Sequence, residues 1–81
     1  MTNRERLKAE FEAFEFREGW TSKPNFKRRG LDIPNRIIAL EVWADGYLGI
    51  SYHDKDAYIK MPSIQAAYDA ANAIAAGRWA K

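Results

Sequence analysis

The side chains of this sequence that are best suited to bind a ligand are aromatic and basic, and they gather in the segment 37–61. Trp43, Tyr47 and Tyr58 are three large rings in that short stretch, and Lys60 closely follows the last of them. Aromatic rings stack on flat groups, and a lysine ammonium attracts anions. Residue types of this kind favour recognition of a partner over catalysis.

A second group of basic residues lies just before that segment, in residues 20–36. The chain has 81 residues and a formal net charge of only +2, and the excess is concentrated here, where the one acid is Asp32. A local basic excess on an otherwise balanced chain is typical of an anion-binding patch, and a solvated loop is the alternative. The basic residues of this segment are Lys23, Lys27, Arg28, Arg29 and Arg36.

The sequence lacks the parts of an enzyme or a metal site. It contains no cysteine, and its single histidine, His53, lies beside Asp54 and Asp56 in a turn-like stretch that offers too few ligands for a metal ion. No serine has the context of a nucleophile elbow, and the glycines form no phosphate-binding loop. We therefore expect no enzymatic activity and no cofactor.

The rings can act together only if a β-hairpin places them on one face, so the register of that hairpin is decisive. A two-residue turn at Asp45-Gly46 would scatter apolar residues over both faces. A three-residue loop, 44–46, with Gly46 in the left-handed conformation, gathers the apolar residues on one face. The pairs that this register predicts are Val42 with Leu48, Leu40 with Ile50 and Ile38 with Tyr52.

The same register continues into a third strand and divides the sheet into two faces. The strands are predicted at about residues 37–43, 47–53 and 57–61. Ala57, Ile59 and Met61 join the apolar face. The opposite face holds the rings and is predicted to comprise Ala39, Glu41, Trp43, Tyr47, Gly49, Ser51, His53, Tyr58 and Lys60.

Two helices are predicted to flank this sheet. Thr2 and Glu5 have the spacing of a capping box, and Gly19 is typical of a helix stop, so the first helix is predicted over residues 3–18. The second is predicted over residues 63–76, where alanines permit a close approach to the sheet.

Together these elements predict a single α+β domain over residues 1–81. Its layout is a two-layer α-β-β-β-α arrangement with a three-stranded antiparallel meander. Residues 20–36 are predicted to be the basic connection between the first helix and the sheet.

The first helix determines whether the rings are accessible. It has a second apolar stripe roughly opposite the first. This stripe consists of Ala9, Ala13, Phe16 and Trp20. If it covers Trp43 and Tyr47, the rings belong to the core. If it does not, the rings form an open surface.

Part of the second helix resembles a known family. The run Ala67-Tyr68-Asp69-Ala70-Ala71, followed by Gly77, is similar to the "AYDxAA…G" helix of AP2-type DNA-binding domains. That family places a three-stranded sheet before the helix and reads DNA with sheet residues, so the resemblance, confined to Ala67–Gly77, implies DNA binding. The strands here lack the family's arginine- and tryptophan-rich signatures at matching positions.

These observations predict a small, non-enzymatic binding module in the cytoplasm, with no membrane segment. Nucleic acid is the favoured partner, because rings stack on bases while cations meet phosphates. The alternative is an accessory protein of the kind found in bacteriophages or mobile elements, which would bind and inhibit or adapt a host protein. The predicted contact residues are Trp43, Tyr47, Tyr58 and Lys60, with Arg28, Arg29 and Arg36 as an electrostatic rim.

Overall fold

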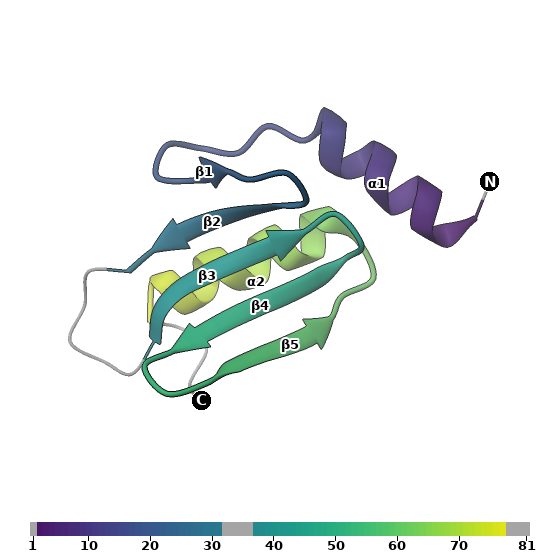
Figure 1. Ribbon diagram of the computed structural model, residues 1–81. Helices are drawn as coiled ribbons and strands as arrows, with labels where there is room; N and C mark the ends of the chain where they lie inside the picture. Colours follow the sequence, from purple (N-terminus) through teal and green to yellow (C-terminus); the bar gives the residue numbers. More distant parts are fainter. Residues whose placement is uncertain (1, 32–36, 78–81) are drawn as a thin grey trace.

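The chain folds into an antiparallel sheet of five strands with one helix on one face and a second helix at one end (Figure 1). The computed structural model describes residues 2–31 and 37–77. The elements are α1 (Asn3–Ala13), β1 (Thr21–Ser22), β2 (Phe26–Gly30), β3 (Ile37–Trp43), β4 (Tyr47–Tyr52), β5 (Asp56–Lys60) and α2 (Ile64–Ala75). Within the described ranges, neither helix is both long and apolar enough to cross a membrane.

The predicted α+β class is confirmed, but the predicted α-β-β-β-α layout is not. The sheet has five strands instead of three, and they lie side by side in the order in which they occur along the chain. The three predicted strands correspond to β3, β4 and β5. The two additional strands, β1 and β2, precede them.

The register of the central hairpin is confirmed where it matters most for the core. Leu40 pairs with Ile50 and Val42 with Leu48, as the three-residue loop requires. Gly46 closes this loop with φ +91°, and its N–H donates to the carbonyl oxygen of Trp43. A left-handed residue at the end of a three-residue hairpin loop favours glycine, because a Cβ is strained there.

The predicted pair of Ile38 with Tyr52 is wrong. Ile37 pairs with Tyr52 and Ala39 with Ser51, so the register shifts between Ile37 and Ala39. An irregularity of this kind inserts one extra residue and reverses the faces on either side of it. Ile37 is therefore buried, and Ile38 is 36% exposed.

The segment predicted as a connection, residues 20–36, contains a hairpin instead. β1 pairs with β2, and β2 continues the sheet by placing Phe26 opposite Trp43. The alternation of apolar residues that identifies a strand is absent from β2, because Lys27 and Arg29 lie on one of its faces and Arg28 on the other. Residues 32–36 of the predicted connection lie outside the described residues.

The first helix is shorter than predicted. Its capping box is present, since Glu5 N–H donates to Thr2 Oγ1 at 3.1 Å and Thr2 N–H to Glu5 Oε1 at 2.9 Å. The helix ends at Ala13 rather than residue 18, and Phe14 is already extended. The positive φ of Gly19 belongs to the turn before β1 rather than to a helix end.

An aromatic cluster explains this early end. Phe14 and Phe16 both contact Tyr68 of α2, with ring centroids 5.0 and 5.2 Å away. Residues two apart point to the same side only in an extended chain, whereas a helix would separate them by about 200°. Trp20 joins the same cluster, with its ring 5.7 Å from that of Tyr68.

The core lies between the sheet and α2. Ser63 caps α2 by accepting a hydrogen bond from Ala66 N–H at 3.0 Å. Ala67 and Ala71 are fully buried, so the alanines bring the helix close to the sheet as predicted. The large buried side chains of this layer are Ile37, Leu40, Val42, Leu48, Ile50, Ile64 and Ile74.

Helix α1 lies beside the loop between β3 and β4 and the start of α2, beyond the end of the sheet (Figure 1). Leu7 packs on Gly46, where an added Cβ would lie 3.0 Å from Leu7 Cδ1. The Glu10 carboxylate accepts hydrogen bonds from the N–H groups of Ile64 and Gln65, both at 3.1 Å. A carboxylate at a helix N-terminus satisfies free amide groups and complements the helix dipole. These contacts fix α1 away from the sheet face opposite α2.

Candidate nucleic-acid interface

The sheet face opposite α2 carries a group of rings that we call the aromatic face, formed by Phe26, Trp43, Tyr47 and Tyr58. Strand pairing places them on this face. Phe26 is opposite Trp43, and Tyr58 is opposite Gly49. Trp43 and Tyr47 are two residues from Glu41 and Gly49, which are opposite each other, so their side chains point to the same side. Tyr47 is 37% exposed and Tyr58 52%, while Trp43 is half-buried. Of the two arrangements open from the sequence, the structure has the one in which the first helix leaves these rings uncovered.

Three of the rings form a row across the sheet. The Phe26 and Trp43 rings are stacked, with centroids 4.3 Å apart and planes inclined by 22°. The Tyr58 ring meets the indole edge-on at 6.1 Å. Aromatic pairs prefer these offset and edge-to-face geometries, which hold each ring in place through the next. The row therefore has fixed positions before any ligand arrives.

Gly49, at the centre of β4, makes room for this row. A Cβ at this position would lie 3.2 Å from Trp43 Nε1 and 2.9 Å from Glu41 Oε1. Glycine inside a strand often marks a place where another group approaches the backbone closely. Here the indole lies across the strand because Gly49 has no side chain.

A carboxylate lies at the centre of the face and organises its neighbours. Glu41 Oε1 accepts the hydrogen bond of the Trp43 indole N–H at 3.1 Å. Its Oε2 accepts one from Arg28 at 2.9 Å, which is also an ion pair. The Glu41 side chain is only 12% exposed, so its charge is balanced mainly by Arg28. This network fixes the plane of the indole and neutralises the middle of the aromatic face.

Positive charge accompanies the rings at the end of the sheet near α1. Lys60 Nζ lies 4.9 Å above the centre of the Tyr47 ring and donates to the carbonyl oxygen of Asp45 at 3.0 Å. The Tyr58 phenol has a raised pKa, because of desolvation first and then the negative charges of Glu41 and Asp56. Tyr58 therefore remains neutral at physiological pH.

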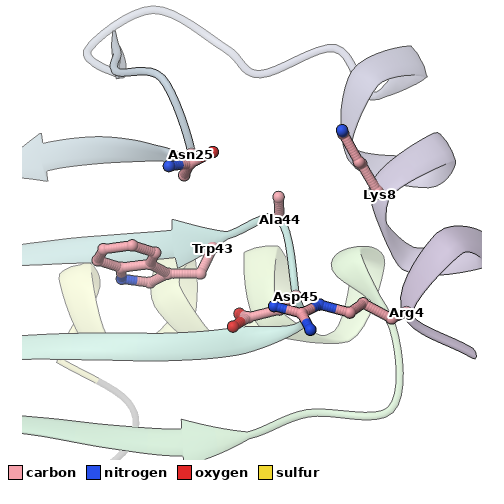
Figure 2. Close-up of a pocket in the computed structure, with 6 residues that line it drawn as sticks. All are labelled: Arg4, Lys8, Asn25, Trp43, Ala44 and Asp45. Carbon is pink, nitrogen blue, oxygen red and sulfur yellow. The ribbon is translucent and has the colours of Figure 1, made fainter.

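A cleft adjoins the aromatic face where α1 approaches the sheet, and we call it the basic cleft (Figure 2). Its volume is about 340 Å³. The residues that line it are Arg4, Lys8, Asn25, Trp43, Ala44 and Asp45. Arg4 and Lys8 are one helical turn apart and extend from α1 toward the sheet. A second hollow, shared by Arg4, Tyr47 and Lys60 among others, connects the cleft with the rings.

The structure brings together the predicted ring residues but only part of the predicted rim. Trp43, Tyr47, Tyr58 and Lys60 share one face. Arg28 lies on that face but is engaged with Glu41.

Of the other two predicted rim residues, one lies on the other side of the sheet and one lies outside the described residues. Arg29 is on the opposite face, where its guanidinium donates to Asn72 Oδ1 of α2 at 3.1 Å. Its placement in the rim is wrong because successive side chains of a strand point to opposite faces, and the prediction treated this segment as a loop. Arg36 lies outside the described residues.

Sequence reasoning missed Phe26, Arg4 and Lys8. Phe26 is the only large apolar side chain of β2, so it gave no periodic signal. Arg4 and Lys8 did have a signal, the i, i+4 spacing that places two cations on one side of a helix. Their meeting with Trp43 depends on the docking of α1, which local sequence does not specify.

The chain matches no protein-family model, no curated protein and no solved structure. The resemblance of Ala67–Gly77 to AP2-type domains therefore stays a prediction. Within that segment Ala67, Tyr68 and Ala71 are buried.

Proposed function

We propose that this protein binds single-stranded nucleic acid on the aromatic face, with phosphates held in and beside the basic cleft. The observation that carries the proposal is the row of Phe26, Trp43 and Tyr58 on an open sheet face. Accessible rings that are held in place cost little to order on binding, and every base has a face that can stack on them.

The rings favour a single strand over a duplex. In a duplex the bases already stack on one another, whereas the bases of a single strand are free to stack on protein side chains. The aromatic face is a sheet surface, and no described element projects from it that would insert into a groove. Its contacts are therefore with the faces of unpaired bases rather than with their edges.

The cations supply attraction to the phosphates. Arg4 and Lys8 line the cleft next to Trp43, and Lys60 lies over Tyr47. A base stacked on Trp43 would place its phosphate toward the cleft. Asp45, in the cleft wall, opposes anions there, so the cations must outweigh it. The contribution of the phosphates to affinity falls with salt, because binding releases condensed counterions.

Fluorescence anisotropy of labelled oligonucleotides tests the proposal. We expect single-stranded DNA or RNA to bind more tightly than a duplex of equal length, with affinity that falls as salt rises. Arg4→Gln and Lys8→Gln should each weaken binding and lower the salt slope by about 0.7. Lys55→Gln, which removes one charge in the β4–β5 turn far from the cleft, is the matched control. No binding to either form at low salt would refute the proposal.

One observation favours a protein partner as the second candidate. The Arg28–Glu41 ion pair leaves the centre of the aromatic face neutral, and aromatic residues with arginine dominate protein–protein contacts. An accessory protein that inhibits or adapts a host protein would use the same rings. A partner that is captured from a nuclease-treated host lysate, and lost in Trp43→Ala, would support this candidate.

A further inference from the structure

We propose that two copies of this chain pair through β5 to form a continuous ten-stranded sheet, in which the two aromatic faces adjoin. The proposal rests on the edge of β5 and does not depend on what the aromatic face binds. In the part of the chain that the structure describes, β5 is the last strand of the sheet and no strand pairs with its outer edge.

The backbone of β5 offers its free hydrogen-bonding groups at three alternate residues. Tyr52 N–H donates to Lys55 O, and Met61 N–H to Gly46 O, at the two ends of the β4–β5 ladder. Antiparallel ladders alternate, so the odd-numbered residues of β5 bond to β4. The N–H and C=O groups of Asp56, Tyr58 and Lys60 therefore point away from the sheet.

The charges on this edge are self-complementary about Tyr58. In an antiparallel pair with Tyr58 opposite its own copy, Asp56 of each chain faces Lys60 of the other. In this register each of the three residues with free backbone groups is opposite one of the same three in the other chain. Their N–H and C=O groups can therefore bond to each other, as an antiparallel ladder requires. Directly opposed unlike charges stabilise such a pair, and opposed like charges destabilise it.

The two other registers that are centred on a residue with free backbone groups are worse. Pairing centred on Asp56 places two carboxylates opposite each other, and pairing centred on Lys60 does the same with two ammonium groups. A shift by one residue would place residues with free backbone groups opposite residues that already bond to β4. Among the registers centred on a residue with free backbone groups, charge thus favours the one centred on Tyr58.

The side chains of the edge also have apolar surface to bury. Ile59 is 46% exposed on the α2 side of the sheet, because β5 is the edge strand and lies to the side of the helix. In the proposed register Ile59 of each chain meets Ala57 of the other. Tyr58, 52% exposed, meets its own copy on the opposite face. The Lys60 ammonium retains free donors beyond its bond to Asp45 O.

Sedimentation velocity of the protein alone, over a range of concentrations at low salt, tests the pairing. We expect a reversible dimer for the natural sequence. Asp56→Lys makes both charges of the edge positive, and Lys60→Asp makes both negative, so each should weaken dimerisation by about tenfold or more. The double variant, Asp56→Lys with Lys60→Asp, restores complementarity and should dimerise again.

Mixing the two single variants gives the sharpest result. Their edges have opposite charge, so together they should form a heterodimer although neither forms a homodimer. Near-ultraviolet circular dichroism of each variant establishes that the fold is retained. A natural sequence that stays monomeric at its highest soluble concentration would overturn the proposal. So would a dimer that is indifferent to both single substitutions, because it would use another surface.

Discussion

The geometry of the aromatic face depends on single side chains, and Trp43 has the most contacts among them. Its ring is stacked on Phe26, meets Tyr58 edge-on and donates a hydrogen bond to Glu41. These contacts lie on the open side of the sheet, apart from the core around Leu40. Removal of the indole should therefore affect ligand binding more than folding.

This difference predicts that two truncations destabilise the fold by different amounts. Leu40 is fully buried, so Leu40→Ala should lower the free energy of unfolding by about 2–5 kcal/mol. Trp43→Ala loses one stacked pair, one edge-to-face contact and one hydrogen bond, all on the half-exposed face, and should cost about 1–3 kcal/mol. Urea denaturation measures both. Equal losses would indicate that Trp43 is a core residue and not part of an accessible surface.

Gly49 allows a second test of the geometry of the aromatic face. In Gly49→Ala the new methyl group would lie 2.9 Å from Glu41 Oε1 and 3.2 Å from Trp43 Nε1. The carboxylate and the indole must move, which should cost about 1–3 kcal/mol and break the Glu41–Trp43 hydrogen bond. Tryptophan emission should shift as the ring is displaced. Unchanged emission and unchanged stability would mean that the indole does not lie against β4.

The sequence largely predicts which residues share a face of the sheet, but it does not predict their ion-pair partners. Trp43, Tyr47, Tyr58 and Lys60 follow from the two-residue period of a strand once the 44–46 loop sets the register. The ion pair of Arg28 could not be predicted, because β2 lacks the apolar alternation by which strands are recognised.

Helix α1 forms one wall of the basic cleft. It carries Arg4 and Lys8, and Glu10 attaches it to the first turn of α2. Residues 2–13 thus contribute to the proposed contact surface on the sheet without belonging to the sheet. The position of the helix, rather than its sequence alone, determines where these two cations lie.

We predict that Glu10→Ala weakens both the fold and the site. Loss of the two hydrogen bonds to Ile64 and Gln65 should lower the free energy of unfolding by about 1–2 kcal/mol. Oligonucleotide affinity should also fall, because α1 no longer holds its cations beside Trp43. Glu12→Ala, an exposed position on the same helix, is the control and should change neither quantity appreciably. Equal effects of both substitutions would contradict this role of Glu10.

The differences between predicted and observed elements have long-range causes. The first helix ends at Ala13 because Phe14 and Phe16 pack on Tyr68, which is more than fifty positions away. Likewise, β1 and β2 are stabilised as strands by pairing with each other and with β3. Tertiary contacts of this kind outweigh local propensity, and a single sequence does not reveal them.

The two faces of the sheet have different roles in the molecule. One face is buried against α2 and provides the hydrophobic stabilisation, while the other carries rings that α2 and α1 leave uncovered. The basic cleft lies where α1 meets the open face. This division places the proposed contact surface on the most regular part of the fold, where its geometry is held by strands.

The proposed stacking of nucleic-acid bases on Trp43 can be measured by a fluorescence titration. Addition of single-stranded oligothymidylate at low salt should quench the tryptophan emission of the natural sequence. In Trp43→Phe most of that quenching should disappear, and Trp43→Ala should bind about ten- to a hundredfold more weakly. If the emission does not change, or changes equally in Trp43→Phe, then bases do not stack on Trp43 and the proposed interface is wrong.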